Sequence, residues 1–161
     1  MKLSLAAAGF AAIWADFPGI RRAAAQTKPP GWPLADEPVE ATLKRLFGGR
    51  SFASGEGKIK MDVPTIAEDG GNVAVSVDAN LPVNGAHRVN HIYIISDKNR
   101  RPMLAKFSLS PDSGRAAIST SVRLATSTDV RAVVEMSDGT LFAISKPVRV
   151  TISGCDLPPQ S

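Results

Sequence analysis

Apolar and polar residues alternate along most of the chain after Lys58, in short runs separated by turn residues. An alternation with period two is typical of strands that bury one face and expose the other. The runs recur about every 8–12 residues, which predicts about seven or eight short strands packed as two antiparallel sheets. We therefore expect an all-β sandwich whose strands follow one another as a meander, with Pro147 marking the start of the last strand as an edge or bend. The positions expected to face its core are Val73, Val75, Val77, Ile92, Ile94, Met103, Ala105, Phe107, Leu109, Ala116, Ile118, Thr120, Val122, Leu124, Val130, Ala132, Val134, Met136, Thr140 to Ile144, Val148, Val150 and Ile152.

A helical period comes before the strands. Apolar residues spaced at i, i+4, i+7 and i+8 predict one short amphipathic helix over residues 38–47. We expect Asp36 to cap this helix and Pro38 to lie in its first turn, while Gly48 and Gly49 end it. A helix this short is marginal alone in water, so its apolar stripe must be buried on its own domain or on a partner. The stripe consists of Val39, Leu43, Leu46 and Phe47.

The first 25 residues have the features of an export signal. Lys2 precedes an apolar run at 3–15, and three small residues at 23–25 offer a cleavage site before Gln26. The segment 16–22 breaks the apolar run and places two arginines after it, whereas a twin-arginine signal places them before it. Either the signal is of the general secretory type, or an arginine-bearing leader precedes the sequence given; a buried N-terminal helix is the other interpretation. We expect export to the periplasm.

The sequence thus divides into four parts. Residues 1–25 form the export signal and residues 26–37 a proline-rich extended linker. Residues 38–152 form the sandwich domain with its N-terminal helix, and residues 153–161 form a polar tail that carries the single cysteine, Cys155.

Composition removes many classes of catalytic site. With one cysteine, the chain has no internal disulfide framework, no CxxC pair and no multi-cysteine metal site. It has two histidines, no HExxH motif and no glycine-rich phosphate loop. No apolar run reaches the roughly 18–20 residues of a membrane-spanning helix. We therefore expect no cofactor, no metal site and no membrane span.

Charge argues against a nucleic-acid partner. Cleavage after residue 25 would remove three basic residues and one acidic residue, which lowers the net charge from +4 to +2 over the remaining 136 residues. No lysine or arginine cluster is interleaved with aromatic residues that could stack on bases. Arg100 and Arg101 form one basic spot in a predicted loop, where they are either solvated or part of a patch that docks a partner.

Cys155 lies outside the alternating pattern, beside Gly154 and three residues after the last core position, Ile152. Free cysteines are usually buried as small hydrophobic residues, so a terminal, polar setting departs from the norm. The thiolate is the reactive form, and the neighbouring Asp156 disfavours its ionisation. We therefore expect a partner enzyme, rather than this chain, to activate the thiol.

Several stretches resemble the SoxY family, and the closing part agrees best. The resemblance covers roughly residues 38–155, and the matching stretches are NVAVSVD (72–78), RPMLAKFSLSP (101–111), STSVRLA (119–125), VRAVV (130–134), SDGTLF (137–142) and VRVTISGC (148–155).

The resemblance implies an immunoglobulin-like two-sheet sandwich and a carrier subunit rather than an enzyme. SoxY is the sulfur carrier of the periplasmic thiosulfate-oxidising Sox system and pairs with SoxZ as a heterodimer. By matching position, Cys155 would hold the sulfur substrate covalently, with Ser153 and Gly154 as the flexible arm. The implied partners are a SoxZ-like subunit, a haem protein that joins thiosulfate to the thiol, a sulfate-releasing hydrolase and an enzyme that oxidises the remaining sulfane sulfur.

The tail departs from the family pattern of two glycines, cysteine and two glycines. Ser153 replaces the first glycine, and six residues follow Cys155, among them Pro158 and Pro159, which favour an extended conformation. The arm is therefore longer and stiffer beyond the thiol than in the family.

One other function is compatible with the sequence, and two more are disfavoured by it. The main alternative is an exported sandwich that binds a protein partner and carries no covalent cargo. A copper site could use His87, His91 and Cys155, but no histidine or methionine follows the cysteine closely. A serine hydrolase lacks support because no GxSxG motif is present.

Overall fold

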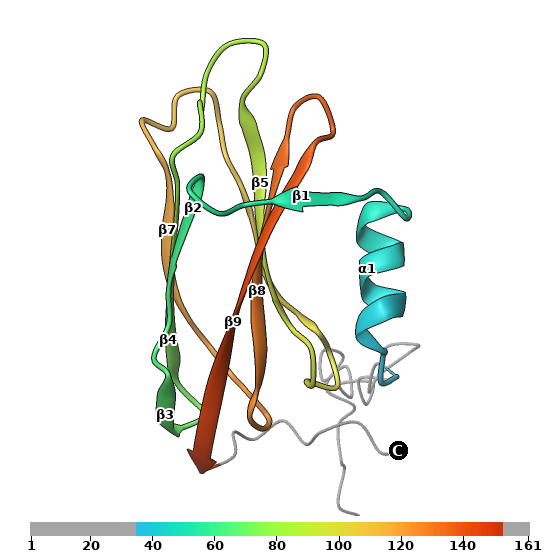
Figure 1. The fold of residues 1–161 in the computed structure, drawn as a ribbon, viewed down its shortest axis with the longest axis vertical. Coiled ribbons are helices and arrows are strands. Elements are labelled where there is room, and N and C mark those ends of the chain that lie inside the picture. Colours follow the sequence, from blue (N-terminus) through green and yellow to red (C-terminus); the bar gives the residue numbers. More distant parts are fainter. Residues whose placement is uncertain (1–34, 153–161) are drawn as a thin grey trace, which may run out of the picture. The chain divides into compact units, whose positions relative to one another are not determined.

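The structure is a computed structural model and describes residues 35–152 (Figure 1). The expected export signal at 1–25, most of the expected linker (26–34) and the cysteine-bearing tail at 153–161 lie outside the described residues. The described elements are α1 (Val39–Phe47), β1 (Phe52–Ser54), β2 (Ile59–Asp62), β3 (Ile66–Asp69), β4 (Val73–Ala79), β5 (Val89–Ser96), β6 (Met103–Ser108), β7 (Ala116–Val122), β8 (Thr128–Met136) and β9 (Leu141–Ile152). Within these residues, no helix is long and apolar enough to cross a membrane.

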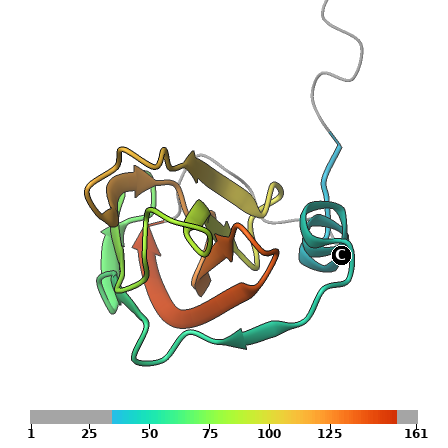
Figure 2. The same cartoon turned by 90° about the horizontal axis from the view of Figure 1, so that it is seen from above.

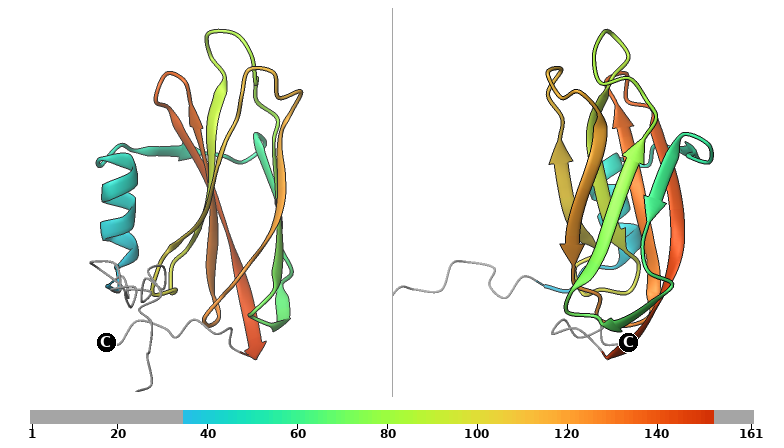
Figure 3. Two further views of the ribbon diagram at one scale, coloured as in Figure 1. Left: turned by 180° about the vertical axis from the view of Figure 1, so that it is seen from behind. Right: turned by 90° about the vertical axis from the view of Figure 1, so that its left-hand side faces the viewer.

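The strands form two sheets that face each other across one apolar core (Figure 3). The larger sheet has the order β1-β9-β8-β5-β6, with β3 added beside β9, and the smaller sheet has the order β2-β4-β7. Alternate residues of the central strands point into the core, as the period of two requires. The predicted all-β two-sheet sandwich with one short N-terminal helix is therefore confirmed. Its most deeply buried side chains include Val73, Val75, Val77, Ile92, Ile94, Leu124, Val130, Ala132 and Val134.

The path of the chain differs from the expected meander. β4 pairs with β7, and β5 pairs with both β6 and β8, so strands distant in sequence lie side by side. Most pairs are antiparallel, but β1 and β3 each pair in parallel with β9. These crossovers were not predictable from alternation, because alternation reports which face is buried and not which strand is the neighbour.

Pro147 does not mark the start of the last strand as expected, because β9 is one strand of 12 residues that runs through it. β1 pairs with β9 at Leu141–Ala143, and β3 pairs with it from Arg149 onward. The Arg149 amide donates to Thr65 on the β3 side, and amides two residues apart point to the same side of a strand. The Pro147 nitrogen therefore faces an edge stretch between the two partners, where a missing N–H donor costs little.

Helix α1 covers the outer face of the larger sheet (Figure 2). Phe47 is almost fully buried there and makes edge-to-face contacts with Tyr93 and Phe52, with ring centroids 5.0 and 5.3 Å apart. The helix ends as predicted, because Gly48 adopts a left-handed conformation (φ 62°) and its amide donates to Lys44. Phe47 of the apolar stripe is thus buried on its own domain, and Val39, Leu43 and Leu46 are half-buried against the same cluster.

The start of the helix corrects two predictions. Pro38 occupies the position just before the helix rather than its first turn, and no side chain caps the helix. Asp36 instead forms an ion pair with Arg100, with 2.6 Å between its Oδ1 and the arginine Nε. The local pattern predicted that the Asp36 carboxylate caps the helix, but a long-range ion pair binds this carboxylate instead.

Candidate functional site

The expected site residues Ser153, Gly154 and Cys155 lie outside the described residues. The structure does define where the segment that carries them begins, because β9 ends at Ile152 (Figure 1). We call the last four residues of β9, 149–152, and their hydrogen-bond partners the root of the tail. The geometry of this root decides from where the thiol is presented.

The root is held by hydrogen bonds on both of its edges. On one edge, the Gly70 amide donates to the Ile152 carbonyl at 2.8 Å and the Arg149 amide donates to Thr65 at 2.9 Å. On the other edge, the Val150 amide donates to the Ser127 hydroxyl at 3.0 Å. A strand paired on both edges has little freedom to move. The tail therefore leaves the sandwich from a fixed point.

A buried polar cluster supports the same end of the sandwich. The Asn99 side chain, 2% exposed, accepts from the Ser96 hydroxyl and the Ala125 amide, both at 3.0 Å, and donates to the Arg123 carbonyl at 2.7 Å. Thr128 joins this cluster and accepts from the Lys98 amide at 3.1 Å. These bonds tie the turn after β5 to the segment between β7 and β8. The sequence did not predict this cluster. Its only signal was Asn99 in a predicted turn, and polar residues in turns are usually exposed at the surface.

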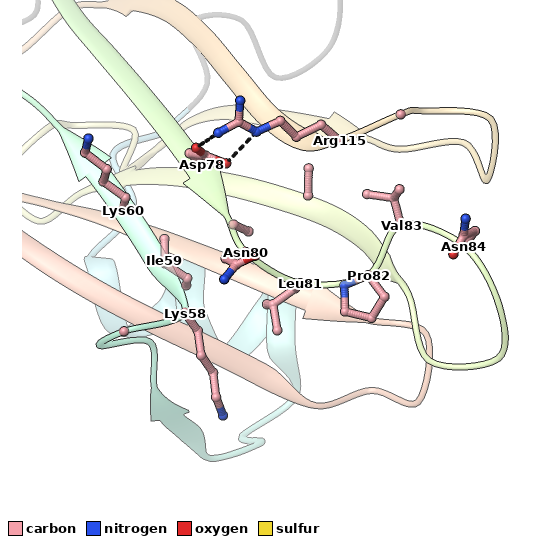
Figure 4. Close-up of a pocket in the computed structure, with 14 residues that line it drawn as sticks. Lys58, Ile59, Lys60, Asp78, Asn80, Leu81, Pro82, Val83, Asn84 and Arg115 are labelled. Atoms are coloured by element: carbon pink, nitrogen blue, oxygen red, sulfur yellow. Dashed lines mark hydrogen bonds and ion pairs between the residues drawn. The ribbon is translucent and has the colours of Figure 1, made fainter.

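A cavity lies at the opposite end of β4 from the root (Figure 4). It has a volume of about 600 Å³, and Arg115 pairs with Asp78 through both carboxylate oxygens at its wall. Cys155 follows Ile152 by three residues, so it can lie at most roughly 10 Å from it. The length of β4, about 20 Å, separates this cavity from the root. The cavity is therefore out of reach of the thiol. Its lining includes Lys58, Lys60, Asn80, Leu81, Pro82, Val83 and Asn84.

The two histidines occupy ordinary loop and strand positions. His87 is exposed and lies 3.5 Å from a carboxylate oxygen of Asp138. His91 lies in β5, where burial, assisted by the charge of Lys106, lowers its pKa. Within residues 35–152, no three His, Cys, Asp or Glu side chains are grouped as metal ligands. The copper hypothesis also needs Cys155, which lies outside this range.

The basic spot at Arg100 and Arg101 is engaged within the domain. Arg100 pairs with Asp36, and its carbonyl accepts from the Glu37 amide at 3.0 Å. Arg101 donates to the Ala35 carbonyl at 3.0 Å. The two arginines therefore fasten the segment that precedes α1.

A second anchor holds the end of α1 to the sheet. Glu135 accepts from Arg50 and from the Tyr93 hydroxyl, each at 2.7 Å. Burial acts to raise the pKa of Glu135, but the hydrogen bonds from Tyr93 and Arg50 outweigh it and leave the pKa below its usual value. Burial, together with the bond to Glu135, raises the pKa of Tyr93. The cluster is a structural ion pair network beside the helix.

Solved structures with the same fold include a carrier protein and several reductases. The sulfur carrier protein SoxY from Chlorobium limicola f thiosulfatophilum superposes with a TM-score of 0.59 at 27% identity, covering 71% of this chain and 96% of that chain. A superoxide reductase (neelaredoxin) from Ignicoccus hospitalis superposes with a TM-score of 0.52 at 18% identity, covering 65% of this chain and 89% of that chain. The second likeness shows the fold alone.

Sequence comparison agrees with the first structure. The search of curated proteins gave no match. The model of the family described as sulfur oxidation protein SoxY matches residues 43–155, a range that begins within α1 and ends at Cys155. Because this match spans most of the chain, the chain belongs to the SoxY family.

Proposed function

We propose that this protein carries sulfur intermediates of thiosulfate oxidation covalently on Cys155, while partner enzymes of the Sox system act on them. Membership of the SoxY family and the likeness to a SoxY sulfur carrier support a sulfur carrier role in that system. The observation that carries the proposal is the match that extends through Cys155, directly after a strand whose last residues are held on both edges. In this proposal the partner enzymes, and not the carrier, perform the chemistry.

In the proposed cycle, the Cys155 thiolate is the point at which sulfur is covalently attached. The Cys155 thiolate and thiosulfate form an S–S bond and give a cysteine S-thiosulfonate, and a haem protein accepts the two electrons that are released. A hydrolase then adds water and releases sulfate and two protons, which leaves a persulfide on the cysteine. A further enzyme oxidises the outer sulfur of the persulfide with three waters, releases six protons and passes six electrons to a redox protein, which leaves an S-sulfonate on the cysteine. Hydrolysis of this S–S bond then releases a second sulfate and two protons and returns the thiolate. Asp156 follows Cys155 in the sequence and its negative charge disfavours the thiolate, so each partner has to supply the activation.

We propose that the protein works in the periplasm, where residues 1–25 would direct it, and that it forms a heterodimer with a SoxZ-like subunit. Ser153 and Gly154 would form the arm between the root and the thiol. Gly154 has no Cβ and allows the arm to adopt several conformations, as successive enzymes require.

Replacement of Cys155 tests the carrier role. We expect Cys155→Ser to abolish thiosulfate-dependent sulfate release by the reconstituted system, whereas Ser153→Ala should retain it. Intact mass of the wild-type protein from thiosulfate-grown cells should show thiosulfonate or persulfide on the Cys155 peptide. Full sulfate release by Cys155→Ser, with partner binding intact, would instead establish an interaction module without covalent cargo.

A further inference from the structure

Both sheets end on the same flank of the sandwich, the larger one with β6 and the smaller one with β7 (Figure 2). Within the described residues, β6 pairs with β5 alone and β7 pairs with β4 alone. Each strand therefore has one side without a neighbouring strand in this part of the chain. We call the unpaired side of β7 the β7 edge.

The β7 edge lacks the features that normally protect an exposed strand. Proteins protect such strands by keeping them short or by placing charges or proline on them. β1, β2 and β3 have only three or four residues each, and β2 and β3 each carry two charged side chains. β6 carries one charge, Lys106. β7 has seven residues and neither a charge nor a proline, so its edge is a template for a further strand.

The hydrogen bonds next to β7 show which of its backbone groups point outward. The Leu124 amide donates to the Gly70 carbonyl on the β4 side at 2.8 Å, whereas the Arg123 carbonyl points the other way and accepts from Asn99. Because the backbone groups of alternate residues point to the same side of a strand, those of the odd-numbered residues of β7 point away from β4. Within residues 35–152, no other segment of the backbone bonds to them. These outward residues are Ala117, Ser119 and Ser121.

A second copy of β7 matches these outward groups. When two copies pair antiparallel about a two-fold axis at Ser119, each Ser119 lies opposite the other, and Ala117 lies opposite Ser121 of the second copy. Both members of each pair are then outward residues. In an antiparallel ladder, such pairs exchange two N–H···O bonds each. The self-pairing therefore uses all the outward backbone groups of the strand.

The side chains are compatible with this register. On the solvent face, only exposed alanine and serine side chains meet. On the core face, Ile118 is half-buried and lies opposite Thr120 of the second copy, so the apolar core continues across the contact. Arg123 lies opposite Arg115 of the second copy, but Asp78 binds Arg115 through both carboxylate oxygens and compensates its charge.

We propose that the β7 edge binds the β7 edge of a second copy of this chain, so that the smaller sheet is continuous across a dimer. The proposal rests on the fold and not on the carrier function. A two-fold contact uses the same edge of both copies, so association stops at the dimer. β9 borders the opposite flank, beside β2, so the dimer leaves the root of the tail uncovered.

The size of the contact predicts a weak dimer. β7 spans about 24 Å, and two sheets about 10 Å apart with their side chains make the flank roughly 20 Å deep. The contact then covers roughly 500 Å² on each copy, below the about 800 Å² of a standard interface. We therefore expect a dissociation constant in the micromolar range and a dimer that dissociates on dilution.

Sedimentation velocity of the full-length protein tests the dimer, with a reductant present to prevent a disulfide at Cys155. The wild type should change from monomer to dimer between about 1 µM and about 300 µM. Ser119→Pro removes an outward N–H and places its ring at the axis, so it should weaken the dimer at least about thirtyfold. Ser119→Ala keeps the amide but loses the hydroxyl contact with Ser76, and it should stay within about threefold. Thermal unfolding should show that each variant is folded.

A designed disulfide tests the register and does not depend on the proline variant. With Cys155→Ser in the background, Ser119→Cys should give a covalent dimer on oxidation, because the facing Cα atoms of a hydrogen-bonded pair lie about 5.5 Å apart. Ser121→Cys is the matched control. The two copies of residue 121 lie on either side of the axis, roughly 14 Å apart, so this variant should stay monomeric on oxidation.

Three outcomes would overturn the proposal. The first is a wild-type protein that is monomeric at about 300 µM. The second is a dimer that folded Ser119→Pro leaves unchanged, or a disulfide that forms equally well in Ser121→Cys. The third is a protein that associates only with a SoxZ-like subunit and loses it in Ser119→Pro, which would assign the β7 edge to that subunit. The carrier function is tested separately by loss of sulfate release in Cys155→Ser.

Discussion

The two ends of the described chain are attached to the sandwich by different kinds of interaction. The root of the tail at 149–152 is held by backbone hydrogen bonds and by the uncharged hydroxyl of Ser127. The N-terminal helix is held by apolar contacts of Phe47 and by two ion pairs, Asp36 with Arg100 and Arg50 with Glu135. The first attachment contains no titratable group among the bonds that hold it, whereas the second depends on two carboxylates.

This difference in bonding indicates that the root at 149–152 is held more firmly than helix α1. Backbone pairing within a sheet opens only with the sheet, so the root shares the stability of the core. A short helix docked on an outer face can separate from it while the core persists. If Cys155 is the attachment point, as proposed above, a root of the first kind fixes the position from which its segment starts. Four experiments would test this contrast, from the largest expected effect to the smallest.

Removal of the main apolar contact of the helix should separate the two attachments. We expect Phe47→Ala to cost about 3–4 kcal/mol, because its side chain is almost fully buried between the helix and the sheet. Hydrogen exchange should then accelerate at the α1 amides but not at the Gly70 amide, which donates to Ile152. Equal acceleration at both sites would show that the helix and the root form one cooperative unit.

Removal of the Asn99 side chain, which is buried at the same end of the sandwich as the root, should destabilise that end. We expect Asn99→Ala to cost about 2–3 kcal/mol, because it leaves the Ser96 hydroxyl, the Ala125 amide and the Arg123 carbonyl without their partner. Chemical denaturation should give the same loss at pH 7 and pH 4, since none of these groups titrates in that range. Asn84→Ala, an exposed change at the far end of the sandwich, is the control and should stay within about 0.5 kcal/mol. A loss that depends on pH would place a charged group in the root.

Neutralisation of the carboxylate at the end of the helix should reveal an acid-sensitive attachment. Glu135→Gln should cost about 1–2 kcal/mol at pH 7, because the Arg50 charge loses its partner. The pKa of Glu135 lies below its ordinary 4.5 in the folded protein, so its contribution is present above pH 4.5 and is lost as pH falls through the folded value. The difference between the wild type and the variant should therefore shrink as the pH falls below 4.5. A difference that grows as the pH falls would contradict this assignment.

The smallest effect is expected for the exposed ion pair between Glu37, just before helix α1, and Arg45 within it. Arg45 forms two hydrogen bonds with Glu37 and lowers the pKa of that carboxylate to about 2. The Arg45 side chain is half exposed, so screening limits the pair, and Glu37→Gln should cost less than about 1 kcal/mol. The contribution should be lost as pH falls from 4.5 towards 2, and 1 M salt should reduce it. Glu40→Gln, on the same helix, serves as the control for the loss of one negative charge.

The alternation of apolar and polar residues was enough to predict the sandwich and most of its core, but Met103 and Ile152, also expected to face the core, are 36% and 65% exposed. Val73, Val75 and Val77 are buried as expected, and so are Val130, Ala132 and Val134. The helix at Val39–Phe47 and its end at Gly48 were also predictable, because period and capping are local properties of the chain. The family followed from stretches that the sequence shares with SoxY, and Cys155 stands where the family match ends.

Partners distant in sequence were decided only by the tertiary structure. The parallel pairing of β3 with β9, the burial of Asn99 and the ion pair of Asp36 with Arg100 join residues far apart along the chain. Local patterns report the preference of a segment for a shape and for one buried face, but they carry no information on which segment lies opposite. For this protein, the sequence showed that a single cysteine, Cys155, follows the last strand, while the packing of β3 against β9 decided how the end of that strand is held.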